Sequence, residues 1–472
     1  MRMTRYDEVA GRILNLIHNG VLKEGDRIPS IRKLSDELGV SVNTVKEAYW
    51  KLENQNYIVA IPQSGFYVKK QSAAAALPVV DPQFLDPQEV SLCRIYGAFQ
   101  NMGHVMPGIS LGIAALDPAS WPTEKMSRFF QEALLFQKQE AYNYIMSPGY
   151  KGLREQIARF SLSGGLNLSP EEIIITNGCH EAVFLALMSL CKPGDTVIFE
   201  SPIYFNLLQL MQQLNLKIIE IPSCDRDGIN LDTLRFVLEN HTVNAMFSIS
   251  NFNNPVGFTM PGPKKKALLK LLSEFEIPLI EDDIYGDIFY QDRPDTCKAY
   301  DTAENVLLCS SFSKTIAPGL RIGWIVPGRY YDAVLKMKTL LNISTASMNQ
   351  IAVTGFLREG GYERHLRNLR KQLKAHVTAM RAVILENFPR GTTVSHPDGG
   401  FLLWVELPEE IDTDHIYQKA LKKNILIAPG RLFSIKDRYS HCMRLNAGIW
   451  NTQVAQAIRY LGQLCADYRP CN

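Results

Sequence analysis

The 472-residue sequence lacks the cysteine patterns that build disulfide frameworks or metal sites. Its nine cysteines are scattered, and they form no Cys-x-x-Cys pair and no spacing interleaved with histidine. Such an odd, dispersed set is typical of free thiols in a reducing compartment, and it excludes a disulfide-stapled secreted domain. We therefore expect an intracellular protein without a structural metal.

Long hydrophobic runs and a strong charge of one sign are also missing. The longest apolar stretch, AVFLALMSLC at 182–191, is too short to span a membrane, and the charged start MRMTRYDEVAGR has no apolar signal region. The formal net charge is +2, and residues 1–70 hold 11 Lys and Arg against 8 Asp and Glu. This weak basic bias does not by itself identify nucleic acid as a partner. We expect a soluble, cytoplasmic protein with no membrane partner.

The first seventy residues have the pattern of three helices followed by a hairpin. Apolar residues recur at helical spacing in three segments that are separated by short glycine-containing breaks. Ser30 is placed to cap the second helix, and Ser41 or Asn43 to cap the third. The strand-like runs YIVAI and FYV flank the turn sequence PQSG. Two helices joined by a tight turn, with a hairpin after them, predict a winged helix-turn-helix over 1–70.

The remaining chain predicts a linker and a larger domain. Residues 71–90 lack periodicity and contain an alanine run and three prolines, which is typical of a linker. From 91 to 472, apolar runs such as TVIFE, AMFSIS and VLLCSS alternate with amphipathic helical segments. This alternation predicts an α/β domain with a largely parallel central sheet. From about 330 onward, long helices precede short strands, as in a smaller α+β lobe.

The segment VLLCSSFSKTIAPGLRIGW, 306–324, is the most informative for chemistry. Ser311, Ser313, Lys314 and Arg321 follow an apolar strand within eleven residues. Hydroxyls and a guanidinium suit a phosphate group, and an amine suits an aldehyde. Taken alone, the segment is also compatible with a solvated lysine in a serine-rich turn, although the phosphate and aldehyde interpretation is favoured.

Two further strand exits carry polar residues. PLIEDDIYGD places Asp282 and Tyr285 after an apolar strand, and SISNFNNPVG places Asn254 after another. Ligands of α/β sheets collect at this end of the strands. A buried carboxylate there can keep a pyridine nitrogen protonated, while a phenol or amide can bind a ring oxygen. Individually, each segment is also explained by ordinary turn chemistry.

Two weaker signals complete the set. IIITNGCHEAVFLAL places Gly178, Cys179 and His180 at a strand-to-helix junction, where free N–H groups suit a phosphate. FESPIY supplies Tyr204, an aromatic residue able to stack on a ring, although most such tyrosines are simply packed.

In their order and separations, these segments resemble class I aminotransferases, pyridoxal-phosphate (PLP) enzymes of fold type I, from about 110 to 465. The resemblance implies that Lys314 forms the Schiff base with PLP and that Asp282 pairs with the pyridine nitrogen. It also implies that Asn254 and Tyr285 bind the ring oxygen and that Tyr204 stacks on the ring.

The same resemblance implies a phosphate site, a partner subunit and a ligand carboxylate site. The implied phosphate ligands are Ser311, Ser313, Arg321, Gly178 and the amides of Cys179 and His180. Tyr144 matches the tyrosine that reaches the phosphate of the other subunit, which implies a homodimer, and Arg444 matches the arginine that holds the substrate α-carboxylate. Many relatives have Ser-Gln at Cys179-His180, and 109–118 is only loosely similar, so the amino compound is left open.

The first seventy residues resemble the GntR type of winged helix, on the residues GDRIPSIRKLSDELGVSVNTVKEAYWKLENQNYI and SGFYV. Contacts with DNA are then expected from the second helix, the recognition helix and the wing. The implied residues are Ser30, Arg32, Ser41, Asn43, Thr44, Lys46, Ser64 and Gly65. Where relatives often carry Arg, this chain has Val42, which either touches a thymine methyl or packs inward. We expect packing.

A GntR-like head joined to an aminotransferase-like body resembles the MocR family of bacterial regulators. That resemblance implies double-stranded operator DNA as a partner, a head-to-tail homodimer with swapped heads, and an amino compound or PLP as the sensed ligand. Three functions are left open: a regulator that senses an amine through bound PLP, a working aminotransferase with an accessory head, and a sensor of PLP itself.

Overall fold

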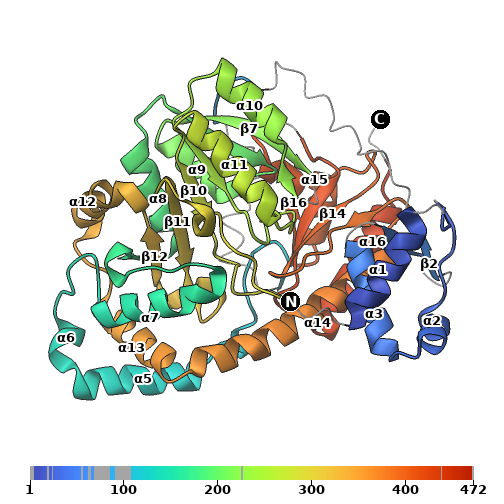
Figure 1. Ribbon diagram of the computed structural model, residues 1–472, viewed down its shortest axis with the longest axis horizontal. Helices are drawn as coiled ribbons and strands as arrows, with labels where there is room; N and C mark the ends of the chain where they lie inside the picture. Colours follow the sequence, from blue (N-terminus) through green and yellow to red (C-terminus); the bar gives the residue numbers. More distant parts are fainter. Residues whose placement is uncertain are drawn as a thin grey trace. The chain divides into compact units, whose positions relative to one another are not determined.

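The computed structural model describes residues 5–18, 21–23, 25–54, 57–61, 65–68, 85–90, 108–224, 227–436 and 438–469. The chain separates into two compact units, Met1–Val80 and Asp81–Asn472, which are treated one at a time below. Figure 1 labels their helices and strands. Within the described ranges, no helix is both long enough and apolar enough to cross a membrane.

The first unit contains three helices and an antiparallel hairpin, as the sequence predicts. These elements are α1 (Arg5–His18), α2 (Ile31–Leu38), α3 (Val42–Asn54), β1 (Ile58–Ile61) and β2 (Gly65–Val68). The hydroxyl of Ser30 accepts the N–H of Lys33 and caps α2, which ends at Gly39 with a φ of 61°. The left-handed conformation there explains the glycine. Apolar residues of all three helices and of the hairpin form one small core.

The second unit is built on a nine-stranded sheet in the order β3-β7-β6-β9-β10-β11-β12-β5, with β8 paired to β7. The five strands from β7 to β11 run parallel, which confirms the largely parallel sheet, while β12 is antiparallel to both of its neighbours. The strands are β3 (Gln88–Glu89), β5 (Ile174–Thr176), β6 (Thr196–Ser201), β7 (Lys217–Cys224), β8 (Gly228–Ile229), β9 (Ala245–Ser248), β10 (Leu279–Asp282), β11 (Val306–Ser311) and β12 (Gly323–Val326).

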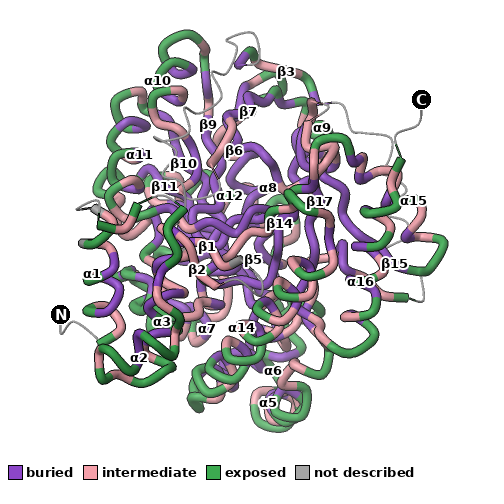
Figure 2. Tube along the Cα trace, turned by 90° about the vertical axis from the view of Figure 1, so that its right-hand side faces the viewer, coloured by how far each residue is buried: buried purple, intermediate pink, exposed green. Residues whose placement is uncertain are grey.

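Helices cover both faces of this sheet, and Figure 2 shows the strands buried between them. Residues of α8 and α9 pack on one face, and residues of α5, α7 and α13 pack on the other. Successive side chains of β11 point to opposite faces of the sheet. Leu307 belongs to the core that includes α8 and α9, and Leu308 belongs to the core that includes α5, α7 and α13. The helices are α5 (Thr123–Phe136), α6 (Lys138–Tyr142), α7 (Lys151–Ser161), α8 (Cys179–Leu190), α9 (Phe205–Gln213), α10 (Leu231–Asn240), α11 (Gly262–Glu274), α12 (Tyr331–Asn342) and α13 (Ser347–Arg358).

The C-terminal part forms a smaller α+β lobe, in agreement with the sequence. Its antiparallel sheet has the order β13-β14-β17-β16, and a two-stranded parallel pair joins β15 to β4. The helix α14 leads into this lobe from the larger sheet. The elements are β4 (Ile109–Ser110), α14 (Gly361–Asn387), β13 (Thr393–Val394), β14 (Leu402–Glu406), α15 (Thr413–Leu421), β15 (Ile425–Leu426), β16 (Ala428–Pro429), β17 (Cys442–Asn446) and α16 (Thr452–Ala466).

One segment differs from the expected linker of 71–90. Gln88 and Glu89 form strand β3, which pairs antiparallel with β7, and Leu85 and Val90 are buried. Residues 85–90 therefore belong to the larger sheet. These six residues gave no periodic signal, because a two-residue edge strand is too short to show one. The other linker residues, 71–84, lie outside the described residues.

Candidate functional site

The predicted ligand residues come together at the edge of the main sheet where its parallel strands end. Asp282 is the last residue of β10, and Lys314 ends the 3-10 turn that follows β11. Asn254 lies beyond the end of β9, and Tyr204 lies beyond the end of β6. Strand order thus gathers residues that are far apart in the sequence at one edge, where α/β proteins bind ligands.

The side chain of Lys314 points into this site. Its Nζ donates to the backbone oxygen of Ala114, 2.5 Å away. Burial, and then the charge of the nearby Arg444, lower the pKa of Lys314 to about 8, while Asp282 opposes this shift. A lowered pKa leaves more of the amine unprotonated near neutral pH, as a nucleophilic lysine requires.

The carboxylate of Asp282 is buried and held from two sides. It accepts the N–H of Ile284 at 2.9 Å and the thiol of Cys179 at 3.3 Å. Burial raises the pKa of Asp282 to about 6, although both hydrogen bonds act against the increase. Burial and the charge of Asp282 also raise the pKa of the Cys179 thiol, so the thiol stays protonated as a donor. A desolvated carboxylate of this kind gains most from a cationic partner such as a protonated ring nitrogen.

Arg444 lies at the small-lobe side of the site and is 1% exposed. Its Nη1 donates to Oδ1 of Asn254 at 2.8 Å, and its Nη2 donates to the backbone oxygen of Gly112. The guanidinium carbon lies 5.3 Å and 5.2 Å from the ring centroids of Phe205 and Phe433. In the part of the chain that the structure describes, Nε of this arginine has no hydrogen-bond partner. Burial lowers the pKa of Arg444, so an anion would relieve an uncompensated charge there.

Gly178 and Arg321 form the opposite end of the site. Nη2 of Arg321 donates to the backbone oxygen of Asn177 at 2.6 Å. Gly178 has a φ of 90°, and a Cβ built on it would lie 2.5 Å from Nη2 of Arg321. Only glycine leaves room for the guanidinium beside the start of α8. The first-turn N–H groups of Cys179 and His180 have no partner within the helix, as at any helix start.

The remaining residues predicted around a phosphate lie in the same region with separate local roles. The hydroxyl of Ser311 accepts the N–H of Ser313 at 3.3 Å and caps the turn that carries Lys314. Desolvation of its ring, and then the charge of Arg321, lower the pKa of His180. The neutral form of His180 is therefore favoured beside the arginine.

Two tyrosines line the site between its ends. Tyr285 is 2% exposed, and its ring packs edge-on against Phe401 at a centroid distance of 5.6 Å. The hydroxyl of Tyr204 accepts a hydrogen bond from Asn206 at 2.6 Å. Tyr144 stands apart from these residues, because its side chain is 71% exposed on the loop after α6.

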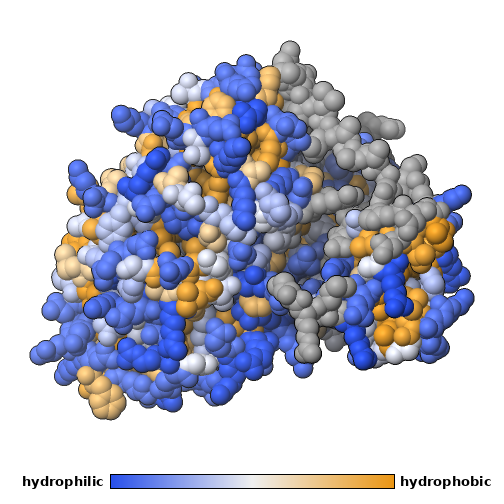
Figure 3. All heavy atoms as spheres, viewed as in Figure 1, coloured by the Kyte–Doolittle hydropathy of each residue, from blue (hydrophilic) through white to orange (hydrophobic). Residues whose placement is uncertain are grey.

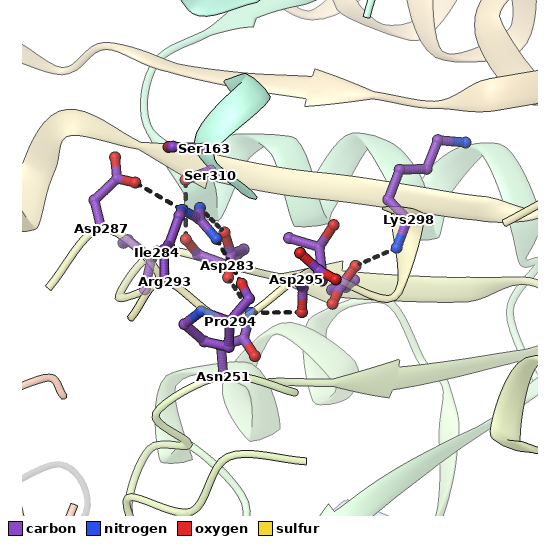
Figure 4. A network of polar contacts seen from close by, with 12 residues as sticks. Ser163, Asn251, Asp283, Ile284, Asp287, Arg293, Pro294, Asp295, Lys298 and Ser310 are labelled. Carbon is purple, nitrogen blue, oxygen red and sulfur yellow. Dashed lines mark hydrogen bonds and ion pairs between the residues drawn. The ribbon is translucent and has the colours of Figure 1, made fainter. Parts of the chain in front are cut away.

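A network of charged side chains supports the site from behind, and it was not predicted from the sequence. Figure 4 shows Arg293 between Asp283 and Asp287, at distances of 2.6 Å and 3.0 Å. Asp287 also accepts the hydroxyl of Tyr362, which in turn contacts Oγ1 of Thr315 at 3.1 Å. Asp283, which follows Asp282, and Thr315, which follows Lys314, are thus connected through this network and Tyr362 at the start of α14.

A second buried ion pair lies beside the start of α8. Nζ of Lys338 is 3.0 Å from the carboxylate of Glu181, and the lysine side chain is 1% exposed. Glu181 also accepts the N–H of Asn177, the residue whose carbonyl holds Arg321. Sequence patterns gave no signal for Lys338, because a lysine in an amphipathic helix usually faces solvent.

The residues present fit PLP in charge and in hydrogen-bonding capacity. The site offers a lysine of lowered pKa, a desolvated carboxylate, and a guanidinium next to a helix start, which suit an aldehyde, a pyridine nitrogen and a phosphate respectively. The folded chain alone leaves one feature unexplained, the Nε of Arg444, which has no hydrogen-bond partner among the described residues. The roles of the individual residues stay predictions.

In the first unit, the start of α3 differs from the expectation at one residue. The hydroxyl of Ser41 accepts the N–H of Thr44 at 3.1 Å and contacts its hydroxyl at 2.8 Å, so Ser41 rather than Asn43 is the cap. Val42 was expected to pack inward, but it is 41% exposed. The helix begins at Val42 itself, which points this first residue away from the core that Val45 enters.

The other residues predicted to contact DNA lie on the surface of the first unit. Asn43, Lys46 and Arg32 are exposed, and the hydroxyl of Ser30 is engaged in the α2 cap. Gly65 is the first residue of β2, and a Cβ on it would meet the Arg27 guanidinium at 3.2 Å. Ser64, the other predicted wing residue, lies outside the described residues.

Comparison with known protein families matches both units. Residues 111–461 match the family described as aminotransferase class I and II, and residues 5–68 match the family described as bacterial regulatory proteins, gntR family. The first of these families is PLP-dependent.

Comparison with individual proteins finds both transcriptional regulators and aminotransferases. The chain is 35% identical over 469 residues to the uncharacterized HTH-type transcriptional regulator YjiR of Escherichia coli (strain K12), covering 99% of each chain. It is 34% identical to the uncharacterized HTH-type transcriptional regulator YdcR of the same organism, over 98% of this chain and 100% of that one. Among solved structures, Pyrococcus horikoshii kynurenine aminotransferase is similar at a TM-score of 0.74 and 28% identity, covering 80% of this chain and 95% of that one.

Proposed function

The chain belongs to the MocR family, in which a GntR-type winged helix is fused to a class I aminotransferase-like domain, and we propose that it is a transcriptional regulator controlled by a ligand in that domain. The division at residues 1–70, a following linker, and a ligand-binding body to residue 472 is part of this proposal. The body senses an amino compound through bound PLP, and the head carries the response to operator DNA.

The observation that carries the sensing proposal is the environment of Arg444. This buried cation has neutral partners at both Nη atoms and none at Nε in the described structure. A buried charge without a counterion is costly, and a carboxylate would compensate it through paired hydrogen bonds. An α-amino acid therefore fits the site better than PLP alone, because PLP has no carboxylate to offer to Arg444.

Residues already described would hold PLP. Lys314 would bind its aldehyde, Asp282 its ring nitrogen, and Asn254 and Tyr285 its ring oxygen, with Tyr204 stacked on the ring. The phosphate ligands would be Ser311, Ser313, Arg321, Gly178 and the amides of Cys179 and His180. When bound, PLP supplies an aldehyde and a ring that withdraws electrons from an attached amine. The lowered pKa of Lys314 makes its amine available near neutral pH, and Arg444 orients the carboxylate of the incoming amine.

The proposed assembly is a head-to-tail homodimer in which each head lies with the partner's body. Support comes from large apolar side chains that are exposed at the outer side of the main sheet; the left-hand edge of Figure 3 shows apolar (orange) atoms scattered among hydrophilic (blue) ones there. These large side chains are 48–79% exposed and come from the end of α5, the α6 loop and the end of α12. They are Leu135, Phe136, Tyr142, Tyr144, Met146, Leu340, Leu341 and Ile343. Several large exposed apolar side chains in one region are typical of an interface, and Tyr144 would reach the partner's phosphate site from this region.

Cytoplasmic localisation is also proposed. The cysteines within the described residues are all free thiols, five of them buried, as expected in a reducing compartment. Operator DNA as the partner is consistent with the same compartment.

The second candidate function is a working aminotransferase with an accessory head. What favours it is that Lys314, Asp282 and Arg444 are all present and close enough to influence one another's pKa. Steady-state transamination measured with a panel of amino acids separates the two. Sustained turnover at rates typical of enzymes, above about one per second, would favour the enzyme.

The regulator proposal is tested through the mutual effect of amine binding and operator binding on each other's affinity. If an amine changes the affinity for operator, operator must change the affinity for that amine by the same factor. The effector is titrated by cofactor absorbance, with and without operator duplex, in the wild type and in Arg444→Ala. We expect different affinities with and without DNA in the wild type and a loss of that difference in the variant. Equal affinities in the wild type would refute ligand control of DNA binding.

A further inference from the structure

Val42 is one of three large apolar residues that are exposed among the described residues of the first unit, with Leu16 and Val21, and it is the one that begins α3. It is the first residue of α3 and 41% exposed, whereas Val45 in the next turn position is fully buried. The core of this unit includes Val45, Ala48, Tyr49 and Leu52 from α3 but not Val42. Folding therefore gains little from this valine.

The neighbouring hydroxyls are already engaged. Ser41 and Thr44 hydrogen-bond to each other, and Ser41 also caps the helix. The side chains left exposed at the start of α3 are those of Val42 and Asn43, followed by Lys46 one turn later. In a helix-turn-helix, the N-terminal residues of the second helix contact the edges of the bases.

We propose that Val42 is a specificity-determining residue that contacts the C5-methyl group of a thymine in the operator. This inference rests on the proposed DNA binding by the first unit. An isopropyl group cannot form hydrogen bonds, and the thymine methyl is the apolar group that a base pair presents in the major groove. The contact would favour thymine over cytosine at one position of each half-site. Neither Asn43 nor Lys46 would provide this discrimination by contacting the methyl group.

The test begins with selection of binding sites by the full-length protein. A random duplex library is amplified in two parallel series, one with thymidine and one with deoxyuridine, which differ by this methyl group alone. We expect a T·A pair to be enriched at one symmetric position in the thymidine series and to lose its enrichment in the deoxyuridine series.

Affinities of the selected duplex then assign the contact to a residue. Replacing that thymine with deoxyuridine should weaken wild-type binding about fourfold per half-site, the effect of burying one methyl group. Val42→Ala should bind the two duplexes equally. Val21→Ala is the matched control, because Val21 is 66% exposed and lies outside α3, and it should keep the fourfold difference. Val42→Thr retains one methyl group and serves if the alanine variant binds too weakly to measure.

Three outcomes are distinguishable. A deoxyuridine effect that persists in Val42→Ala would assign the methyl contact to another residue and overturn the inference. The absence of any methyl-sensitive thymine in the selected site would also overturn it, while leaving DNA binding intact. If the full-length protein enriches no sequence at all, the proposed DNA-binding function itself fails.

Discussion

Arg444 and Asn254 are joined by a hydrogen bond of 2.8 Å that connects the two lobes of the second unit. Arg444 belongs to β17 of the small lobe, and Asn254 follows β9 of the main sheet. The residue proposed for the ligand carboxylate is thereby tied to one proposed for the cofactor ring. A carboxylate arriving at Arg444 competes with Asn254 for Nη1, so ligand binding can alter how the small lobe is held.

Removing the Lys314 amine tests cofactor attachment. Lys314→Ala should abolish the yellow absorbance of the purified protein and the borohydride-reducible lysine adduct, because Lys314 is the lysine whose charge acts on Asp282 in the described part of the chain. The exposed Lys270→Ala is the control and should keep both signals. An adduct that survives in Lys314→Ala would assign the attachment to a different lysine.

Neutralising Asp282 tests the buried carboxylate in the cofactor-free protein. Burial raises the Asp282 pKa from 3.8 to about 6, so the folded state holds an extra proton between these values. The contribution of Asp282 to the free energy of unfolding therefore falls as pH rises through this window, by up to roughly 3 kcal/mol above pH 6. Asp282→Asn should be more stable than the wild type near neutral pH, with the advantage shrinking towards pH 4.

Calorimetric unfolding at several pH values measures this advantage. Asp292→Asn, at an exposed position, is the matched control. A stability difference between Asp282→Asn and the wild type that does not change with pH would contradict the assigned cause. When PLP is bound, the sign should reverse, because the aspartate then pairs with a cationic ring nitrogen.

The buried pair Lys338–Glu181 should matter for both stability and cofactor binding. Lys338→Met leaves the Glu181 carboxylate without its cation, and breaking a buried pair in this way costs about 3–5 kcal/mol. Because Glu181 holds the N–H of Asn177, PLP affinity should fall as well. The double variant Lys338→Met/Glu181→Gln should recover much of the stability.

Thermal unfolding and PLP titration together measure this effect. The exposed Lys336→Met on the same helix is the control and should change neither quantity. If Lys338→Met unfolds like the wild type, the ion pair contributes nothing to the fold.

Arg32 tests the electrostatic part of DNA binding. Its exposed side chain follows the α2 cap, and Arg32→Ala should weaken binding to every duplex and reduce the salt slope by about one. The measurement is the duplex dissociation constant at several salt concentrations. Arg12→Ala removes the same charge from α1 and should leave the slope unchanged. A sequence-dependent loss in Arg32→Ala would indicate a base contact instead.

The fold was largely predictable because its signals are local. Caps such as Ser30, the stop at Gly39, and apolar runs that end in polar residues all act within a few positions of the sequence. Since parallel strands end at one edge, Asp282 and Lys314 could be placed together before any contact was known.

The missed features depend on contacts between distant segments. Cys179 donates to Asp282 across 103 positions, and Arg444 reaches Gly112 across 332. No local pattern records such partners. Val42 was misjudged for a related reason: its spacing fits the buried face of α3, but the first residue of a helix has no preceding turn to shield it. The edge strand β3 was missed because two residues have no measurable period.

Helix α14 runs for 27 residues, from Gly361 to Asn387. Its first turns hold Thr315 and Asp287 through Tyr362, and its later residues Val377, Met380 and Ile384 pack in the core of the small lobe. At 1.5 Å per residue the helix is about 40 Å long. A helix of that length can move as a rigid rod, and a tilt of about five degrees at the end near Lys314 displaces the other end by about 3.5 Å. Ligand binding near Lys314 can in this way displace the distant end of α14 as a rigid body, without any part of the chain unfolding.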